Sequence, residues 1–179
     1  MKIFKKLDTK EISILYMEYR LATLSDLNKI WDKNIQKHPD DLRWVRWKEE
    51  YINYNKNNEA KTFVVVKNNE PIGEMTLVLR DSVKAVRNKD YLCNNTDTAN
   101  MNAFRIEKAY EGQGHISKLH KLVEDYAKTL GIKKLTIGVD ANETRNIAIY
   151  LHFGYNKYVG YEIDHEENDA LVLYYEKNI

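Results

Sequence analysis

Residues 101–139 read MNAFRIEKAYEGQGHISKLHKLVEDYAKTLGIKKLTIGV, and their pattern is the most informative about the fold. Met101 to Tyr110 is rich in residues that favour a β-strand. After two glycines, apolar residues recur every three and four positions until Gly131, which is the pattern of an amphipathic helix closed by a C-terminal glycine. Lys134 to Val139 predicts the next strand. The stretch therefore indicates strand, glycine turn, helix and strand in succession.

The flanking sequence predicts further strands and helices with few breakers, since the chain has 7 Gly and 2 Pro. Thr23 with Asp26 resembles a capping box that opens a helix. The expected elements are a strand at 14–21, helices over 24–35 and from Asp40 or Asp41 onward, strands at 60–67 and 72–80, a long polar loop at 81–100, a helix at 142–153, and strands at 155–163 and 170–176. The order β-α-α-β-β-β-α-β-α-β-β predicts a mixed α/β fold, and no linker or repeat divides residues 1–179, so a single domain is expected.

Composition excludes several classes of function. Lys plus Arg number 28 against 27 Asp plus Glu, so no global field attracts nucleic acid or an anionic membrane. There is no apolar run of membrane-spanning length, and the charged start MKIFKKLDTK is unlike a signal peptide, so a cytoplasmic protein is expected. The lone Cys93 makes no internal disulfide and has no base beside it, and the five His show no metal-binding spacing. No metal is expected.

The glycine turn at Gly112 and Gly114 leads directly into the helix. Free backbone N–H groups at a helix N-terminus favour an anion, and glycine permits the positive φ and close backbone approach that a phosphate needs. The pattern is neither a P-loop nor a complete dinucleotide-binding fingerprint. A plain tight turn is the alternative interpretation.

The segment FRIEKAYEGQGHISKLHKLVEDYAKTLGIKKLTIGV, followed by NETRNIAIYLHFGY, resembles the acetyl-CoA-binding core of the GNAT superfamily of N-acetyltransferases. The resemblance covers about residues 101 to 160. Its three features are the strand with its glycine turn and helix, the TLGI link, and the Tyr150, Gly154, Tyr155 ending, which matches the common Y-x-x-x-G-F. It implies a GNAT-like central mixed sheet of about six to seven strands flanked by about four helices, with acetyl-CoA as cosubstrate.

The resemblance also implies site residues. Ile106 to Lys108 would pair with the pantetheine arm and help polarise the thioester carbonyl, and Lys118 or Lys121 would reach a phosphate. Backbone amides would hold the pyrophosphate from Gln113, Gly114, His115, Ile116 and Ser117. Asn142 or Asn146 would hydrogen-bond the cofactor. Tyr150 would protonate the departing thiolate as general acid, with a packed core aromatic as the alternative role.

Two positions depart from the family pattern at the glycine turn. Glu111 stands where the family has Gln or Arg, which puts a carboxylate near the pyrophosphate, and Ile116 stands where it has Gly or Ala. A partly cationic His115 is expected to compensate. Asn142 also lies eight residues before Tyr150, one more than the family pattern, so Asn146 is the alternative.

The acceptor side is less defined. Glu107 and Glu74, both on predicted strands, are candidates to accept the proton that an amine must lose, although a strand Glu is commonly a solvated surface residue.

The segment from Glu162 to Asp169 (EIDHEEND) holds five carboxylates and no Lys or Arg. Its negative charge suits the binding of a cationic amine, and a solvated hairpin tip is the alternative interpretation. The loop with Asp90 and Tyr91, together with Trp44 and Trp47, is expected to wall the acceptor side, with core packing as the alternative for both Trp residues.

Three functional hypotheses follow. The leading one is an acetyl-CoA-dependent N-acetyltransferase that acts on a small cationic amine, such as a polyamine or an aminoglycoside, by direct attack in a ternary complex. The second is acetylation of a protein N-terminus or lysine. The third is a non-catalytic GNAT-like module that senses or only binds an acyl-CoA, or that has lost it. The expected partner is a small-molecule amine, without nucleic acid or membrane, and the choice between monomer and homodimer stays open.

Overall fold

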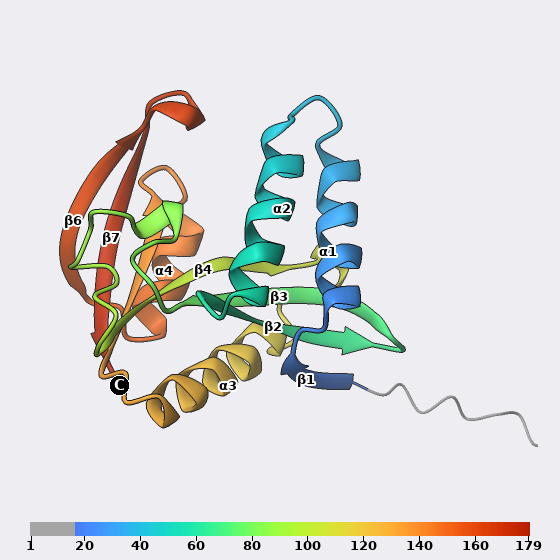
Figure 1. Cartoon of the computed structure of the whole chain (residues 1–179), viewed down its shortest axis with the longest axis horizontal. Coiled ribbons are helices and arrows are strands. Elements are labelled where there is room, and N and C mark those ends of the chain that lie inside the picture. Colours follow the sequence, from blue (N-terminus) through green and yellow to red (C-terminus); the bar gives the residue numbers. More distant parts are fainter. Residues whose placement is uncertain (1–16) are drawn as a thin grey trace, which may run out of the picture.

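The computed structural model describes residues 17–179, in which seven strands form one mixed sheet in the order β1-β2-β3-β4-β5-β7-β6 (Figure 1). The strands are β1 (Met17–Leu21), β2 (Ala60–Lys67), β3 (Glu70–Val78), β4 (Thr98–Ile106), β5 (Lys134–Asp140), β6 (Lys157–Asp164) and β7 (Ala170–Asn178). The helices are α1 (Leu24–Lys37), α2 (Arg43–Lys56), α3 (His115–Thr129) and α4 (Thr144–His152), with short 3-10 turns η1 (Lys84–Val86), η2 (Lys108–Tyr110) and η3 (His165–Glu167). The predicted element order and fold class are confirmed, and residues 14–16 of the predicted first strand lie outside the described residues.

Strand directions follow from the connections. Only β4 and β5 pair in parallel, and α3 forms the crossover between them; the other neighbouring strands pair antiparallel. A parallel pair needs such a long connection because its strands start at the same end of the sheet. The predicted antiparallel front and strand–helix–strand crossover are therefore both present.

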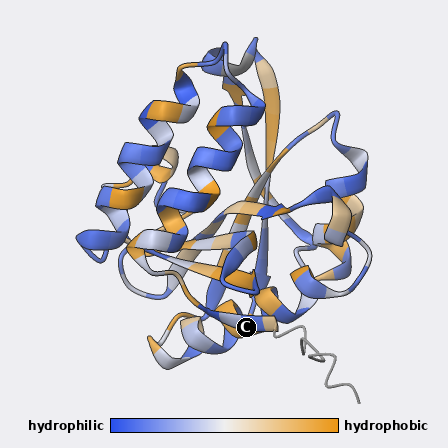
Figure 2. Cartoon of the chain, turned by 90° about the vertical axis from the view of Figure 1, so that its right-hand side faces the viewer, coloured by the Kyte–Doolittle hydropathy of each residue, from blue (hydrophilic) through white to orange (hydrophobic). Residues whose placement is uncertain are grey.

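Helices cover both faces of the sheet. Figure 1 shows α1 and α2 on one side of strands β2 to β4 and α3 on the other. The largest apolar cluster lies between the sheet, α3 and α4, where Leu119, Val123 and Leu135 are fully buried. A smaller aromatic cluster around Trp31 and Tyr51 lies under α1 and α2. In Figure 2 the helices alternate between hydrophilic and hydrophobic positions, as expected when one face of each is buried.

The first helix begins where the sequence indicates. The backbone N–H of Asp26 donates to Thr23 Oγ1 at 3.2 Å, and the backbone N–H of Thr23 donates to the Asp26 carboxylate at 2.8 Å. Arg20 from β1 also binds the Asp26 carboxylate at 2.6 Å. The predicted capping box is confirmed, and the arginine additionally ties it to the sheet.

Some boundaries differ from the prediction because local hydrogen bonds compete with the regular elements. The strand expected over 101–110 runs from Thr98 to Ile106, since the N–H of Tyr110 turns back to the carbonyl of Glu107 at 2.8 Å. The helix expected from residue 142 starts at Thr144, because the N–H of Asn142 donates to the Asp140 carboxylate at 2.8 Å. The loop over 81–100 contains η1 and contributes the start of β4.

A β-bulge in β4 opens the sheet. Residues Glu74 and Thr76 of β3 pair with Arg105 and Asn102, so two β4 residues lie opposite one residue of β3, and one of the two, Ala103, has a φ of 46°. Such a bulge bends its strand. The pairing of β4 with β5 ends at 101 and 137, although both strands continue beyond. The far halves of β4 and β5 are therefore not hydrogen-bonded to each other.

No helix within residues 17–179 is long and apolar enough to cross a membrane. The same residues contain no cluster of three His, Cys, Asp or Glu side chains arranged to hold a metal ion.

Candidate active site

Two hollows meet where β4 leaves β5. The glycine-turn cleft consists of adjoining cavities of about 330 and 510 Å³ that share Ile106, Glu111, Gly112, Ile116, Arg145 and Ile149. The aromatic cavity, of about 690 Å³, lies among α1, α2, the ends of β4 and β5, and the β6–β7 hairpin. Phe104 and Arg105 line both the 330 Å³ cavity and the aromatic cavity. A molecule that extends along β4 in the cleft therefore comes next to a molecule in the aromatic cavity.

The glycine turn has the backbone geometry that an anion requires. Gly112 and Gly114 have φ values of 71° and 77°, and a Cβ added at either position would meet no atom within 4 Å. Helix α3 begins at His115, so the first amides of its opening turn have no carbonyl within the helix to bind. Open space, free amides and the positive end of a helix dipole coincide here.

The two departures from the expected turn sequence have different structural outcomes. The carboxylate of Glu111 accepts a hydrogen bond from the guanidinium of Arg145 on α4 at 2.9 Å, so its charge is paired within the cleft. Ile116 is half-buried and forms part of the cleft wall. The side chain of Gln113 turns back to donate to the carbonyl of Ala109 at 3.0 Å, which leaves its backbone as the part facing an anion. The sequence analysis missed Arg145, since an exposed helical arginine carries no distinguishing signal.

His115 is held neutral rather than cationic. Its Nδ1 lies 2.7 Å from the hydroxyl of Tyr19 on β1. Burial lowers the pKa of His115, and the nearby ammonium groups of Lys118 and Lys67 lower it further. The lowered pKa favours the neutral imidazole, so it does not support the expected role of His115 as a partial cation.

The predicted cofactor residues are only partly brought together. Ile106 ends β4 and lines the cleft, whereas Lys108 lies in η2 and is exposed, so the unpaired edge of β4 stops before it. Asn146 lines the cleft and Asn142 does not, which favours Asn146 of the two alternatives. Ser117 lines the larger cavity of the cleft.

Neither of the two candidate lysines lines the cleft. The ammonium of Lys118 lies over the Tyr19 ring, 5.6 Å from its centre. Lys121 pairs with Asp125 at 2.9 Å on the outer face of α3.

The aromatic cavity takes its walls from segments far apart in the sequence. Its aromatic side chains are Trp31, Trp47, Tyr51, Tyr54, Phe104, Tyr150 and Tyr174. Trp47 thus walls the cavity as expected, whereas Trp44 is stacked on His38 with ring centroids 4.3 Å apart and does not line it. From the 81–100 loop, Lys84 and Lys89 line the cavity, but Asp90 and Tyr91 do not.

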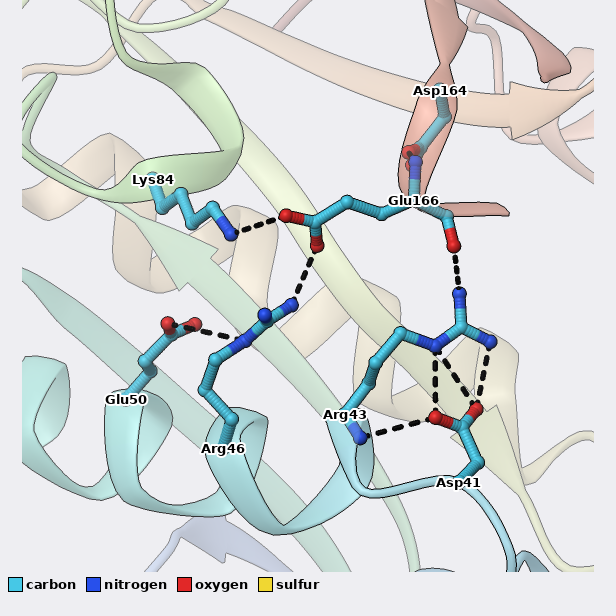
Figure 3. Close-up of polar contacts among 7 residues, drawn as sticks. All are labelled: Asp41, Arg43, Arg46, Glu50, Lys84, Asp164 and Glu166. Atoms are coloured by element: carbon cyan, nitrogen blue, oxygen red, sulfur yellow. Dashed lines mark hydrogen bonds and ion pairs between the residues drawn. The ribbon is translucent and has the colours of Figure 1, made fainter. Parts of the chain in front are cut away.

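Carboxylates also line the aromatic cavity, and about half of them are neutralised. Glu162 binds Lys89 and accepts from the Tyr174 hydroxyl at 2.7 Å. Glu166 of η3 binds Lys84 at 2.9 Å and Arg46 of α2 at 2.5 Å (Figure 3). Three other lining carboxylates form no ion pair within the described part of the chain: Asp140, Glu143 and Asp164. The cavity therefore has unpaired negative charge that a cationic molecule would neutralise.

The hairpin tip of β6 and β7 is tied down over this cavity. Besides the Glu166 carboxylate contacts, the guanidinium of Arg43 donates to the Glu166 backbone carbonyl (Figure 3). His165 and Asp169 at the tip bind each other at 2.6 Å. The acidic segment is thus neither a purely solvated tip nor an unpaired acidic patch, because its Glu166 is bonded to α2 and η1.

Tyr150 lies at the junction of the two hollows. It is buried, lines the aromatic cavity, and packs edge-on against Phe104 with ring centroids 5.2 Å apart. Burial raises the pKa of Tyr150 well above that of a free phenol, and the carboxylate of Glu143 adds to the effect. The hydroxyl is therefore protonated at neutral pH and able to donate a proton, while the ring also belongs to the main apolar cluster.

The candidate proton acceptors are placed differently. Glu107 lines the glycine-turn cleft and pairs with Lys33 at 3.0 Å, away from the aromatic cavity. Glu74 is fully buried and binds Arg105 at 2.8 Å, and it lines neither hollow. Cys93 is fully buried and burial raises the pKa of its thiol, which does not suit a nucleophile.

Comparisons with known proteins agree with this geometry. The model of the acetyltransferase (GNAT) family matches residues 21–155. Similar solved structures include an N-acetyltransferase from Staphylococcus aureus Mu50, with 20% identity, a TM-score of 0.64 and coverage of 91% of this chain and 98% of that chain. A ribosomal-protein-alanine N-acetyltransferase from Brucella melitensis has 14% identity, a TM-score of 0.65 and coverage of 90% and 99%.

A spermidine N-acetyltransferase SpeG chimera from Vibrio cholerae and hSSAT has 18% identity, a TM-score of 0.63 and coverage of 90% and 94%. No curated protein matches the chain significantly. The solved structures share the fold at low identity, and the family model covers the glycine turn, α3, β5 and α4. The chain therefore belongs to the acetyltransferase (GNAT) family.

Proposed function

We propose that this acetyltransferase moves an acetyl group from acetyl-CoA to the primary amine of a small cationic molecule, by direct attack in a ternary complex. The observation that carries the proposal is the junction at Phe104 and Arg105, where the glycine-turn cleft meets the aromatic cavity. Two substrates held in these hollows would meet beside Tyr150. No exposed cysteine near the junction offers an acyl-enzyme route, since Cys93 is buried elsewhere.

The glycine-turn cleft fits the cosubstrate. A Cβ at Gly112 or Gly114 would occupy space that is open in front of the turn, and amides of His115, Ile116 and Ser117 would hold the pyrophosphate there. The free edge of β4 up to Ile106 offers backbone groups for the pantetheine arm. Acetyl-CoA would supply the activated acetyl group, and the residues of this chain would bind and orient it.

The aromatic cavity favours a cationic acceptor. Asp140, Glu143 and Asp164 supply unpaired negative charge, and aromatic faces such as that of Trp47 attract ammonium groups. Among the similar structures, one is named a spermidine N-acetyltransferase and another a ribosomal-protein-alanine N-acetyltransferase. The ion pair between Glu166 and Arg46 connects the hairpin tip to α2 at the cavity, which favours a small molecule over a protein segment.

Tyr150 is the proposed general acid for the departing thiolate, because it lines the aromatic cavity, packs on Phe104, which lines both hollows, and is protonated at neutral pH. Glu107 stays a prediction as the proton acceptor, and its position beside Lys33 in the other hollow does not favour it. The unpaired carboxylates at the ends of β5 and β6, Asp140 and Asp164, are closer to where the amine would bind.

Calorimetric titration with acetyl-CoA tests the first half of the proposal. Saturable binding at one molecule per chain is expected, followed by thiol release when a diamine or polyamine is added. Absence of binding would overturn the enzymatic function and favour a GNAT-like module that has lost its cofactor. Release of thiol with a peptide amine, but with no small amine, would replace the small-molecule acceptor by a protein one.

A further inference from the structure

A hydrogen bond between β1 and the start of α3 lies beside the glycine turn. The hydroxyl of Tyr19 is 2.7 Å from Nδ1 of His115, although the residues are 96 positions apart in the sequence. Figure 1 shows the end of α3 next to β1, so the contact joins the first described strand to the helix N-terminus. His115 is the first residue of α3 and is more than nine-tenths buried.

The charges around this pair determine where the protons lie. Burial lowers the pKa of His115 and raises the pKa of Tyr19, so both groups are neutral near pH 7. The ammonium of Lys118 lies 5.6 Å from the centre of the Tyr19 ring and, with that of Lys67, disfavours a cationic imidazole. A neutral phenol donates well to an unprotonated imidazole nitrogen, which leaves the imidazole proton on the other nitrogen, Nε2.

That second nitrogen has no partner. Nε2 of His115 is buried and forms no hydrogen bond with any residue of the described part of the chain. A buried donor without an acceptor costs free energy, so such groups usually have a role. His115 lines the 510 Å³ cavity together with Gly112, Gly114 and Ser117, at the place where the free helix amides favour an anion.

We propose that Tyr19 is a positioning residue that holds His115 in its Nε2–H tautomer, so that this donor joins the backbone amides of the glycine turn in binding a phosphate group of CoA. The inference rests on the proposed function, because it takes CoA as the ligand of the glycine turn. It assigns β1 a role in cofactor recognition and explains why a buried, neutral histidine begins α3. Tyr19 itself acts only through His115.

Two measurements on Tyr19→Phe test the role of the hydroxyl. Calorimetry with CoA is expected to show a Kd about two- to threefold weaker, because the imidazole proton is then divided between the two ring nitrogens and only the Nε2–H form binds the phosphate. Weak binding of pantetheine, which lacks the phosphates and is followed by NMR titration, is expected to stay the same. Tyr126→Phe removes a hydroxyl from α3 near Phe63 rather than the glycine turn, and it serves as the matched control.

The tautomer gives a readout that a purely structural role would not move. Imidazole ¹⁵N shifts of the wild-type protein are expected to report the Nε2–H form for His115, and Tyr19→Phe is expected to give a mixture of both tautomers. The loss in CoA affinity that Tyr19→Phe causes should disappear in a His115→Phe background, because Tyr19 acts only through His115.

The outcomes separate this inference from the proposed function. An Nδ1–H tautomer in the wild type, or an unchanged Kd for CoA in Tyr19→Phe, would overturn the inference while CoA binding stands. Wild-type protein that binds no CoA would overturn the proposed function, and with it the ligand assigned to His115.

Discussion

The guanidinium of Arg145 on α4 donates to the carboxylate of Glu111 at 2.9 Å across the glycine-turn cleft. The pair joins the segment before α3 to α4, which are separated by the whole crossover and β5. It shows how this chain tolerates a carboxylate beside a proposed pyrophosphate site. The charge of Glu111 is compensated from another helix rather than removed by substitution.

Replacing Glu111 by Gln is expected to tighten CoA binding about three- to tenfold. The change removes a repulsive charge and frees Arg145, which is largely exposed, to reach a phosphate. Calorimetry at low and high salt measures the effect, which should shrink as salt rises. Asp125→Asn breaks a pair with Lys121 on the outer face of α3 and should leave affinity unchanged. Weaker CoA binding by Glu111→Gln would show that Glu111 helps to hold the cofactor.

Gly114→Ala is expected to reduce CoA affinity by at least tenfold while the protein stays folded. A φ of 77° strains any L residue by about 1–2 kcal/mol, and the added methyl would enter the space proposed for phosphate. Gly131→Ala is a matched control, because its φ of 78° and open surroundings give the same strain at the other end of α3. Equal effects of both variants on CoA binding would argue against a phosphate at the glycine turn.

Tyr150→Phe is expected to lower kcat by roughly 100-fold with CoA affinity retained. The variant keeps the ring that packs against Phe104 and removes only the hydroxyl, so thermal unfolding should change little. Because burial raises the pKa of Tyr150, the wild-type kcat should show no loss from ionisation of this group between pH 7 and pH 9. An unchanged kcat in the variant would assign Tyr150 to packing alone.

Asp164→Asn is expected to raise KM for a cationic amine roughly fivefold, since it removes unpaired charge from the aromatic cavity. The KM for an acceptor without additional cationic groups should change less. Asp169→Asn is the control on the same hairpin tip, because Asp169 binds His165 but does not itself line the cavity. A similar rise in KM for both variants would indicate long-range attraction by the tip rather than a local contact.

Stability should fall between pH 6.5 and pH 4 because of His120. Burial among Tyr155 and Phe153 lowers the pKa of His120 to about 4, whereas the unfolded chain takes up this proton near pH 6.5. Stability is thus unaffected above pH 6.5 and decreases below it, by roughly 3 kcal/mol at most. Urea unfolding at several pH values measures the slope, which should flatten in His120→Gln. The same slope in that variant would assign it to other groups.

Local sequence signals were sufficient for most of the fold. The amphipathic period of α3, the Thr23–Asp26 capping box and the β2–β3 hairpin each depend on residues close together in the chain. Such patterns act through helix and strand geometry that any tertiary structure preserves. The element order was therefore correct even where boundaries shifted by a few residues.

The candidate site was predictable only in part. The glycines of the turn and Tyr150 belong to the segment that resembles the family, and in the structure the glycines line the glycine-turn cleft while Tyr150 lines the aromatic cavity. The neutral state of His115 could not be read from sequence, because it depends on a cavity wall and on Tyr19 from β1. The capture of Glu166 by Arg46 likewise joins residues 120 positions apart.

The strand, the glycine turn, the helix and the free amides after Gly114 could be predicted from the sequence, because neighbouring residues set the backbone conformation and hydrogen bonding there. Which charges are compensated, and where the hollows meet, depends on the tertiary structure. Arg145 neutralises Glu111, and the bulge at Ala103 separates β4 from β5, through contacts between distant segments. Pairing energies and pKa values depend on distances in space, which a linear pattern does not contain.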